Sequence, residues 1–442
     1  MASCDEEWLD AKRDLRLIVP ETLNDMKLLI RDENNLAKDN NNLIELSADD
    51  YYIPSASFAS RTVIERNAYL WEKDVYEGQQ NLADWNQAYS QVEVANVIIE
   101  GLSRIERNSS NQHEWDDVKG SALHLRGRAM YYLAQTFSPP YDSKTASTDL
   151  GIPIRLKPDT QAPTVRSTLQ ETYDQILADF NEAASLLPNA PEFIMDASKP
   201  SAYGYLARCY LVMSNFQKAL EFSQKYLDQH SELLDFNTLN LNATFPIPRY
   251  NREVAQHSES SRVYGAFVFS SSRIDNSIYS QYANNDLRKV VFFRNMGSGE
   301  SGTYGFRGSY TGGVQLFSGI STNEMYLIRS ESNARMGNVQ AAIKDINDLL
   351  ITRWTAGTYI PYTASSAEEA LNLILIERRK ELMRRGQRWI DLRRLNKESR
   401  YATKIVRVLD GVQYDLPPND QRYVLPIPDY VITLSGIQQN PR

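Results

Sequence analysis

The sequence predicts a mainly α-helical protein in which helix pairs of the tetratricopeptide type form a scaffold, interrupted by a large irregular insertion with few short strands. Three observations lead to this fold class. Apolar residues recur every three or four positions over residues 82–102, as on one face of a helix. Two later segments repeat each other, with Met213 matching Met336 at an offset of 123. The residues between them are rich in glycine and aromatic side chains.

Two further long helices are predicted in the first half of the chain. Residues 115–137 form one, which ends where two prolines follow, because proline cannot continue a helix. The other begins with the sequence Thr168-Leu169-Gln170-Glu171, which fits a capping box. Between them, five prolines in residues 138–166 predict an extended surface excursion.

The repeated segments predict two helix pairs that pack side by side. Aromatic, small and turn residues occupy equivalent positions in both copies, as in tetratricopeptide repeats. Tandem copies would lie about 34 residues apart, so a large insertion must separate these two. Small side chains at four positions would allow the helices to approach closely: Ala207, Ala219, Ser330 and Ala342.

The insertion between the repeats has the composition of loops. Residues 264–319 contain nine of the twenty glycines and eleven aromatic residues. Regular helices avoid this glycine density because each glycine loses much conformational freedom. We expect irregular loops with short strands, such as residues 289–293, laid over the helical scaffold.

A charged segment, residues 377–394, contains eight basic and three acidic residues in a chain whose net charge is −8. A nucleic-acid site is disfavoured because the sequence pI is near 5.3. Helical spacing predicts pairing of Glu381 with Arg384 and Arg385, and of Glu377 with Lys380. Three apolar residues after a break at Gly386 would anchor a buried ionic hinge between the helices and the C-terminal segment: Trp389, Ile390 and Leu392.

The same segment also resembles a sequence motif of a known protein family. Its pattern ExxxEL, followed by Gly386-Gln387-Arg388-Trp389-Ile390-Asp391-Leu392-Arg393, is similar to the fingerprint of the SusD/RagB family. Asn285-Asp286-Leu287-Arg288, Pro426-Ile427-Pro428 and Gln439-Asn440-Pro441 resemble further family elements in the expected order. The resemblance implies a SusD-like fold and a cell-surface lipoprotein that captures oligosaccharides for a SusC-like TonB-dependent transporter in the outer membrane.

We expect one SusD-like unit over residues 1–442. Its parts would be an N-terminal tether (1–20), the helical scaffold (80–230 and 320–395), a ligand-side insertion (230–320) and a C-terminal segment that packs back on the scaffold (396–442).

The two cysteines have different surroundings. Cys209 lies in an apolar helical stretch and is predicted to be buried. Cys4 follows Ala2-Ser3 and precedes an acidic run, which resembles the end of a lipoprotein signal. The alternative is a cytosolic protein with an incidental cysteine. Because family members begin with a lipidated cysteine, the resemblance implies acylation of Cys4 and an anchor on the extracellular face of the outer membrane.

Catalytic motifs are largely missing from the sequence. It has no HExxH, no GxSxG and no Walker A lysine, and it predicts no metal site and no cofactor. Residues 297–302 fit GxGxxG, but no helix pattern follows, so a dinucleotide site is disfavoured. We therefore expect a binding protein rather than an enzyme, although 56 acidic residues leave a glycoside hydrolase pair open. A RagB-like peptide-binding protein is the closer alternative.

Aromatic rings outside the helix patterns are the candidate ligand contacts. Sugars stack on exposed rings, and their hydroxyls exchange hydrogen bonds with amide and charged side chains. Burial is the more frequent fate of any single ring, but Trp71 is the tryptophan that helix periodicity explains least. We predict that one exposed shallow patch gathers these residues: Tyr52, Trp71, Tyr76, Tyr279, Tyr282, Asn284, Arg288 and Tyr304.

Overall fold

The computed structural model describes residues 20–159 and 161–442. The α-helices within these ranges are α1 (Leu23–Ile30), α2 (Glu33–Leu36), α3 (Asn42–Ser47), α4 (Ser55–Phe58), α5 (Val63–Leu70), α6 (Ala83–Leu102), α7 (Gln112–Phe137), α8 (Leu169–Leu186), α9 (Lys199–Val212), α10 (Phe216–Leu227), α11 (Asn276–Tyr279), α12 (Arg288–Val291), α13 (Thr322–Arg335), α14 (Val339–Leu350), α15 (Ala367–Glu381), α16 (Gln387–Leu395) and α17 (Asp429–Ser435).

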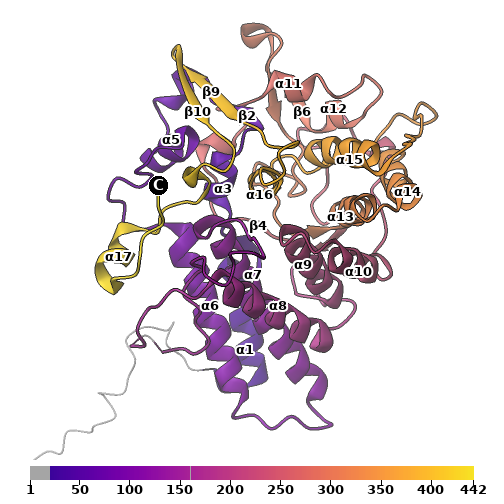
Figure 1. The fold of residues 1–442 in the computed structure, drawn as a ribbon. Coiled ribbons are helices and arrows are strands. Elements are labelled where there is room, and N and C mark those ends of the chain that lie inside the picture. Colours follow the sequence, from indigo (N-terminus) through magenta and orange to yellow (C-terminus); the bar gives the residue numbers. More distant parts are fainter. Residues whose placement is uncertain (1–19, 160) are drawn as a thin grey trace, which may run out of the picture.

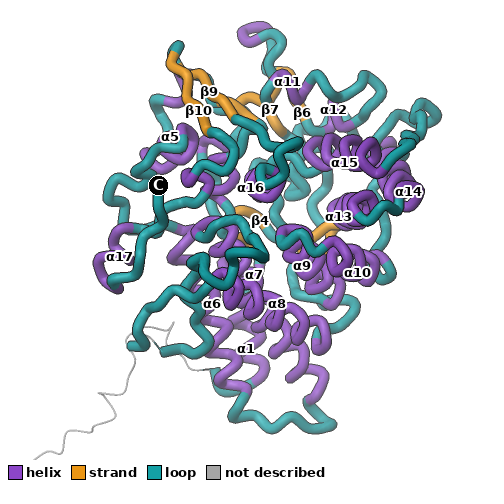
Figure 2. The backbone as a smooth tube through the Cα atoms, in the orientation of Figure 1, coloured by secondary structure: helices purple, strands orange, loops and turns teal. Residues whose placement is uncertain are grey.

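The strands are short and form two-stranded sheets. Their pairs are β1 (Lys38–Asp39) with β4 (Glu259–Ser260), β2 (Tyr51–Tyr52) with β5 (Arg273–Ile274), β3 (Val254–Gln256) with β8 (Ile320–Ser321), β6 (Phe293–Asn295) with β7 (Tyr304–Phe306), and β9 (Ile405–Leu409) with β10 (Val412–Leu416). The fold is therefore mainly α-helical, as predicted (Figure 2).

A continuous array of helices forms the scaffold (Figure 1). Neighbours along the array are α6 with α7, α7 with α8, α8 with α9, and α9 with α10. The insertion then intervenes in the sequence, yet α10 packs directly on α13, which packs on α14 and α15. The two repeated helix pairs thus lie side by side, which confirms the prediction from the repeat.

Small side chains lie where the repeat predicted a shared core. Ala207, Ala219, Ser330 and Ala342 are each 0% exposed. The Ser330 hydroxyl donates to the backbone oxygen of Ala342 at 2.7 Å, which ties α13 to α14 and satisfies a polar atom in the core.

The sequence also predicted helix boundaries well. At the start of α8, Glu171 N donates to the Thr168 hydroxyl at 3.1 Å and Thr168 N donates to the Glu171 carboxylate at 2.8 Å, so the capping box is present. Helix α7 ends at Phe137, before the prolines, but begins at Gln112, three residues earlier than predicted.

Within the insertion, the predicted strand at residues 289–293 is wrong. Residues 288–291 form the short helix α12, and β6 begins at Phe293. The cause is a local turn, because the Asp286 carboxylate accepts from Arg288 N at 3.0 Å and favours helical backbone there. Loops and short elements of the insertion cover the end of the scaffold near α12 and β6 (Figure 1).

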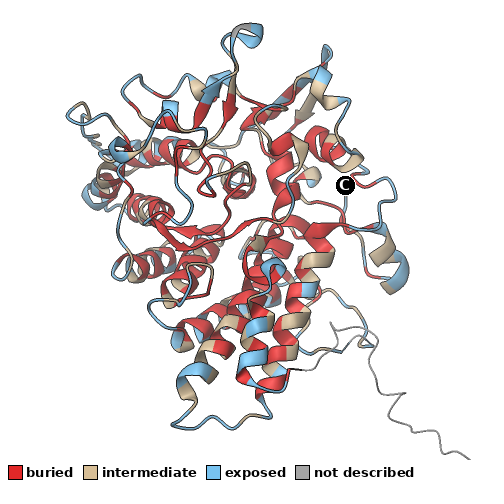
Figure 3. Cartoon of the chain, turned by 180° about the vertical axis from the view of Figure 1, so that it is seen from behind, coloured by how far each residue is buried: buried red, intermediate tan, exposed pale blue. Residues whose placement is uncertain are grey.

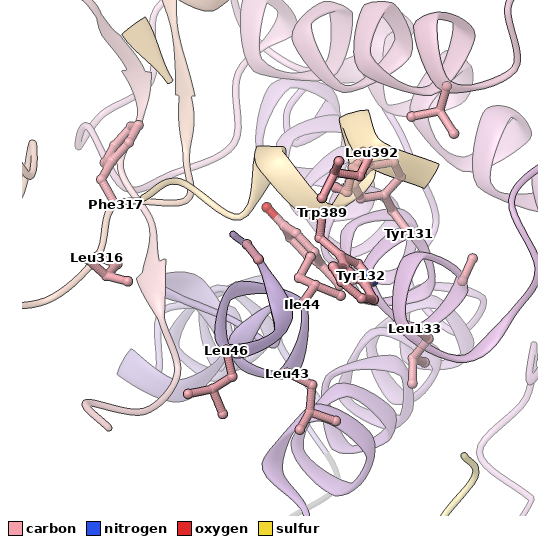
Figure 4. Close-up of a cluster of buried hydrophobic side chains, with 14 of the residues drawn as sticks. Leu43, Ile44, Leu46, Tyr131, Tyr132, Leu133, Leu316, Phe317, Trp389 and Leu392 are labelled. Carbon is pink, nitrogen blue, oxygen red and sulfur yellow. The ribbon is translucent and has the colours of Figure 1, made fainter. Parts of the chain in front are cut away.

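The main core joins segments that are far apart in sequence. Leu43 and Ile44 of α3, Tyr131 and Tyr132 of α7, and Trp389 of α16 are buried in one cluster (Figure 4). Ile390 and Leu392 are also buried, as predicted for the anchors of the charged segment. Seen from behind, buried residues line the inner faces of the helices and exposed ones occupy the outer loops (Figure 3).

The charged segment is a buried ionic cluster at this junction. Gly386 has a left-handed φ of 71°, and a side chain there would meet Asn41, so glycine is required. Lys380 pairs with Glu377 at 2.8 Å, as predicted. Most arginine partners come from distant elements, while Asp286 and Asp391 are local. The pairs are Arg288 with Asp286, Glu377 and Glu381; Arg353 with Glu253 and Glu381; Arg384 with Glu45; Arg388 with Asp49; and Arg394 with Glu331 and Asp391.

The predicted local pairs of Glu381 are therefore wrong. Arg384 has a left-handed φ of 60° after the end of α15, which turns its side chain away from the helical position. Its guanidinium lies 3.3 Å from Glu45, and Arg385 donates to Ser321 and Asn323 instead. The cluster joins α3, α13, α15 and α16 rather than stabilising α15 alone.

No helix in residues 20–159 and 161–442 is long and apolar enough to cross a membrane. Cys209 is buried, as predicted, whereas residues 1–19, which include Cys4 and nearly all of the expected tether (1–20), lie outside the described residues.

Candidate functional site

Trp71 does not form an exposed platform, and this expectation is wrong. Its side chain is 1% exposed, and its indole N–H donates to the backbone oxygen of Ser47 at 2.9 Å. The ring lies under the guanidinium of Arg407, whose Cζ is 4.6 Å from the ring centre. Trp71 does not fit the helical periodicity of the sequence because it is the C-cap residue of α5 and has a left-handed conformation, with φ 56°.

Three other predicted contacts are also buried. The Tyr76 hydroxyl donates to the backbone oxygen of Pro426 at 2.6 Å, and the Tyr282 hydroxyl donates to that of Lys380 at 2.9 Å. Arg288 is 0% exposed inside the ionic cluster. Each of these polar groups has a hydrogen-bond partner within the protein. Tyr76, Tyr282 and Arg288 therefore support the fold, and the expectation that they contact a ligand on an exposed patch is wrong.

The remaining predicted residues, Tyr52, Tyr279, Asn284 and Tyr304, are at least partly exposed, and contacts link the last three through Lys289. The rings of Tyr279 in α11 and Tyr304 in β7 are stacked, with centroids 3.5 Å apart and planes at 13°. Lys289 Nζ lies 5.1 Å from the centre of the Tyr279 ring and donates to Asn284 Oδ1 at 3.1 Å. Both rings are partly exposed and Asn284 is exposed. We call these residues, with Tyr52, the loop face.

Tyr52 is linked to the tyrosine pair through β5. It pairs with Arg273 in the sheet of β2 and β5, and Asp275 immediately after β5 caps α11. The Asp275 carboxylate accepts from Ser277 N at 2.8 Å. The pairing of β2 with β5 and the capped turn after β5 thus connect Tyr52 to the segment that carries Tyr279.

An ion pair holds the outer loop of this surface in place. Arg273, 3% exposed, donates from Nε and Nη2 to the two Glu300 oxygens at 2.6 and 2.7 Å. The guanidinium lowers the pKa of Glu300, so the pair stays charged at neutral pH. The ion pair thus holds the glycine-rich loop at residues 297–302 next to β7, which begins at Tyr304. No helix follows this loop directly.

The electrostatics of the loop face suit a neutral polyhydroxyl ligand. Burial and the neighbouring Tyr304 hydroxyl raise the pKa of Tyr279, so its phenol is neutral at pH 7. Tyrosine hydroxyls can donate and accept hydrogen bonds, while the Lys289 ammonium donates and the Asn284 amide does both. A stacked aromatic pair flanked by these groups can contact the C–H face and the hydroxyls of a sugar.

A cleft with aromatic side chains in its wall, the buried Trp85 and the partly exposed Tyr89, was not predicted from the sequence. A cleft of about 300 Å³ lies between α6, the excursion at residues 153–164 and α17, with Trp85 and Tyr89 in its wall. Their ring centroids are 4.9 Å apart, and Glu93, Arg155 and Lys157 also line it. Burial raises the pKa of Glu93. Trp85 was assigned to the helix pattern, and no signal in the sequence indicates that Pro153 and Val431 would complete a cleft beside it.

The described residues contain no group of three or more histidine, cysteine, aspartate or glutamate side chains arranged to hold a metal ion. The carboxylates of the ionic cluster are paired with arginines.

Two family models match the chain. One, described as starch-binding associating with outer membrane, matches residues 7–211, and the SusD family model matches residues 320–442. A curated relative, SusD-like protein P2 of Formosa agariphila, is 29% identical over 143 residues, which are 32% of this chain and 26% of the relative. The match thus spans about a quarter of that relative's length.

Solved structures share the fold over nearly the whole chain. A SusD superfamily protein from Bacteroides thetaiotaomicron is 21% identical, with 95% of this chain and 100% of that chain covered and a TM-score of 0.77. A SusD-like carbohydrate binding protein from Bacteroides vulgatus is 18% identical, with 94% and 97% covered and a TM-score of 0.71. Family models at both ends and a common fold throughout lead to one conclusion: the chain belongs to the SusD/RagB family.

Proposed function

We propose that this protein is a carbohydrate-binding protein of the outer membrane that captures oligosaccharides on its loop face. The observation that carries the proposal is the accessible stack of Tyr279 and Tyr304 with Lys289 and Asn284 beside it. Family membership supports it, since the matching model describes starch-binding proteins associated with the outer membrane.

We further propose that the protein binds without turnover and delivers its ligand to a SusC-like TonB-dependent transporter. The helical scaffold provides a broad rigid surface for such a contact, because α6 to α10 and α13 to α15 pack in one array. In this proposal residues 230–320 form the ligand side, residues 396–442 pack back on the scaffold, and acylated Cys4 anchors the protein at the extracellular face.

The proposal is tested with a glycan array followed by calorimetry on the glycans that bind. The double variant Tyr279→Ala/Tyr304→Ala should lose binding while keeping its melting temperature. Tyr210→Ala is a matched control, because Tyr210 is also half-buried and stacked, on Phe222 in the helical scaffold, with planes at 11°.

Two outcomes would redirect the proposal. Binding of peptides and of no glycan would assign the protein to the RagB-like type. Release of shorter sugars from a bound oligosaccharide by the purified protein would make it a glycoside hydrolase.

A further inference from the structure

The loop that joins β6 to β7, at residues 297–302, is tied to the rest of the molecule by one ion pair. Among the hydrogen bonds and ion pairs of the described residues, only that of Glu300 with Arg273 runs from this loop to an element outside the β6–β7 hairpin. A Cβ built on Gly297, Gly299 or Gly302 would have no atom beyond the adjacent residues within 4 Å, so the loop backbone is unpacked there. The ion pair is therefore the contact that holds the loop against its neighbours.

Arg273 is the fixed half of this pair. Its Nη1 donates to the backbone oxygens of Phe269 at 2.8 Å and Ser272 at 2.9 Å, which sets the orientation of the guanidinium. Its side chain is 3% exposed, whereas that of Glu300 is 45% exposed. When the pair opens, Glu300 and its loop move into solvent while Arg273 stays in place.

Both ends of the loop carry a glycine in a left-handed conformation. The φ angle is 92° at Gly297 and 78° at Gly302. Glycine adopts such angles without the steric cost that a side chain adds, and moving loops commonly change their backbone angles at a few terminal residues. The two glycines therefore allow residues 298–301 to swing as a unit once Glu300 is released.

The ion pair lies between two parts of the loop face. Arg273 is directly opposite Tyr52 in the sheet of β2 and β5. Glu300 comes shortly before Tyr304, the first residue of β7, and β7 lies against β5. The closed loop therefore stands at the edge of the stack that Tyr304 forms with Tyr279.

We propose that Arg273 and Glu300 form a latch that closes the loop at residues 297–302 beside the loop face and slows the dissociation of a bound glycan. A bidentate, charge-assisted pair gives the closed loop a defined position. The exposed carboxylate and the unpacked glycines allow it to open without disrupting a core. The ligand part of this inference rests on the proposed function, whereas the latch itself is a property of the free protein.

Hydrogen exchange of the ligand-free full chain tests the latch. The amides of Glu300 and Thr303 donate to the backbone oxygens of Gly297 and Glu300, each at 3.1 Å, so their exchange reports opening at the two hinge glycines. Glu300→Gln keeps the size of the side chain but removes its charge. Relative to the intrinsic rates, exchange at both amides should become about tenfold faster, as expected for the loss of one charge-assisted contact.

Two comparisons show whether the effect belongs to this ion pair. Glu398→Gln is the matched control, because Glu398 is also a partly exposed glutamate on a mostly buried arginine, 2.8 Å from Arg335, and should leave exchange at residues 297–302 unchanged. Arg273→Gln should speed exchange as Glu300→Gln does. The double variant should be no faster than either single variant, because all three proteins lack the same contact.

NMR line-shape analysis of a titration adds the ligand. The first probe is maltoheptaose, because the matching family model describes starch binding; if it does not bind, the probe is the oligosaccharide that binds best on the glycan array. Glu300→Gln should raise the dissociation rate at least about threefold without lowering the association rate, because the open loop no longer retains the glycan. Glu398→Gln should show the rates of the wild type.

The outcomes separate the latch from its role in binding. Unchanged exchange at residues 297–302 in Glu300→Gln, or additive effects of the Arg273 and Glu300 variants, would refute the latch. Faster exchange together with wild-type dissociation of a bound glycan would leave the pair as a support of the hairpin and refute its role in retention. If no glycan binds the wild type, the proposed function and the retention role fail together, while the exchange data still decide whether the latch exists.

Discussion

Replacing Glu381 by glutamine should destabilise the protein strongly, because this carboxylate holds two buried arginines. It is 1% exposed and lies 2.8 Å from Arg353 and 3.2 Å from Arg288, and it accepts from the Asn323 amide at 2.8 Å. Glutamine keeps the size of the side chain but removes the charge and adds a donor that faces other donors. Removing one partner of a buried ion pair costs about 3–5 kcal/mol.

The pKa shift of Glu381 gives a second value for the free energy of unfolding that this variant should lose. Although burial alone would raise it, the two arginines lower the pKa of Glu381 from 4.5 to about 2. At about 1.4 kcal/mol for each pKa unit, this shift corresponds to roughly 3 kcal/mol. Because the folded pKa lies below the unfolded one, this stabilisation is fully present above about pH 5 and is lost as the pH falls towards 2.

Urea denaturation of wild type and Glu381→Gln at several pH values measures both effects. The difference in the free energy of unfolding should be about 3 kcal/mol or more at pH 7 and should shrink between pH 5 and pH 2.5. Glu221→Gln is the matched control, since Glu221 forms exposed pairs with Lys218 and Lys225, and should cost less than about 1 kcal/mol. A loss below about 1 kcal/mol for Glu381→Gln, or a loss that does not change with pH, would refute the reasoning.

Three further predictions test the packing and the anchor. Ala219→Trp should destabilise by at least about 1 kcal/mol in thermal or urea unfolding, because Ala219 is fully buried in α10, which packs on α13; unchanged stability would contradict the shared core. Trp71→Ala should cost about 3–5 kcal/mol by leaving a cavity under Arg407, whereas a variant with wild-type stability and lost glycan binding would restore Trp71 to the ligand site. Cys4→Ala in the full-length protein of the native host should leave the membrane fraction; if it stays there when the transporter is deleted, acylation of Cys4 is not the anchor.

The helical scaffold could be predicted because its signals are local. The apolar face of residues 82–102, the capping box at Thr168 and the repeat around Ala219 and Ala342 each lie within one or two helices. The junction at residues 377–394 was also predicted as a buried ionic element, since so many arginines in an acidic chain need partners.

The individual partners in that junction could not be predicted. Glu381 binds Arg288, which comes from the insertion, and Arg353, which comes from the loop after α14. Helical spacing alone favoured Arg384, but a left-handed residue after α15 breaks the spacing. Such pairs depend on where the chain returns, and a single sequence does not contain that information.

The candidate site could be predicted only in part, because the burial of a ring also depends on segments that are distant in the sequence. Glycine-rich composition located Tyr279 and Tyr304 in a loop region, and both remain accessible. Trp71 had no helical explanation, yet Ser47 and Arg407 cover it from distant segments. Lys289 was missed because only the fold brings its ammonium over the Tyr279 ring.

The measurement that tests the central claim most directly is the affinity of the Tyr279→Ala/Tyr304→Ala protein for a glycan that the wild type binds. A stacked ring contributes on the order of 1 kcal/mol or more, so calorimetry should show an affinity at least roughly tenfold lower, with the melting temperature unchanged and with Tyr210→Ala binding like the wild type. Wild-type affinity in the folded double variant would contradict the assignment of glycan binding to the loop face.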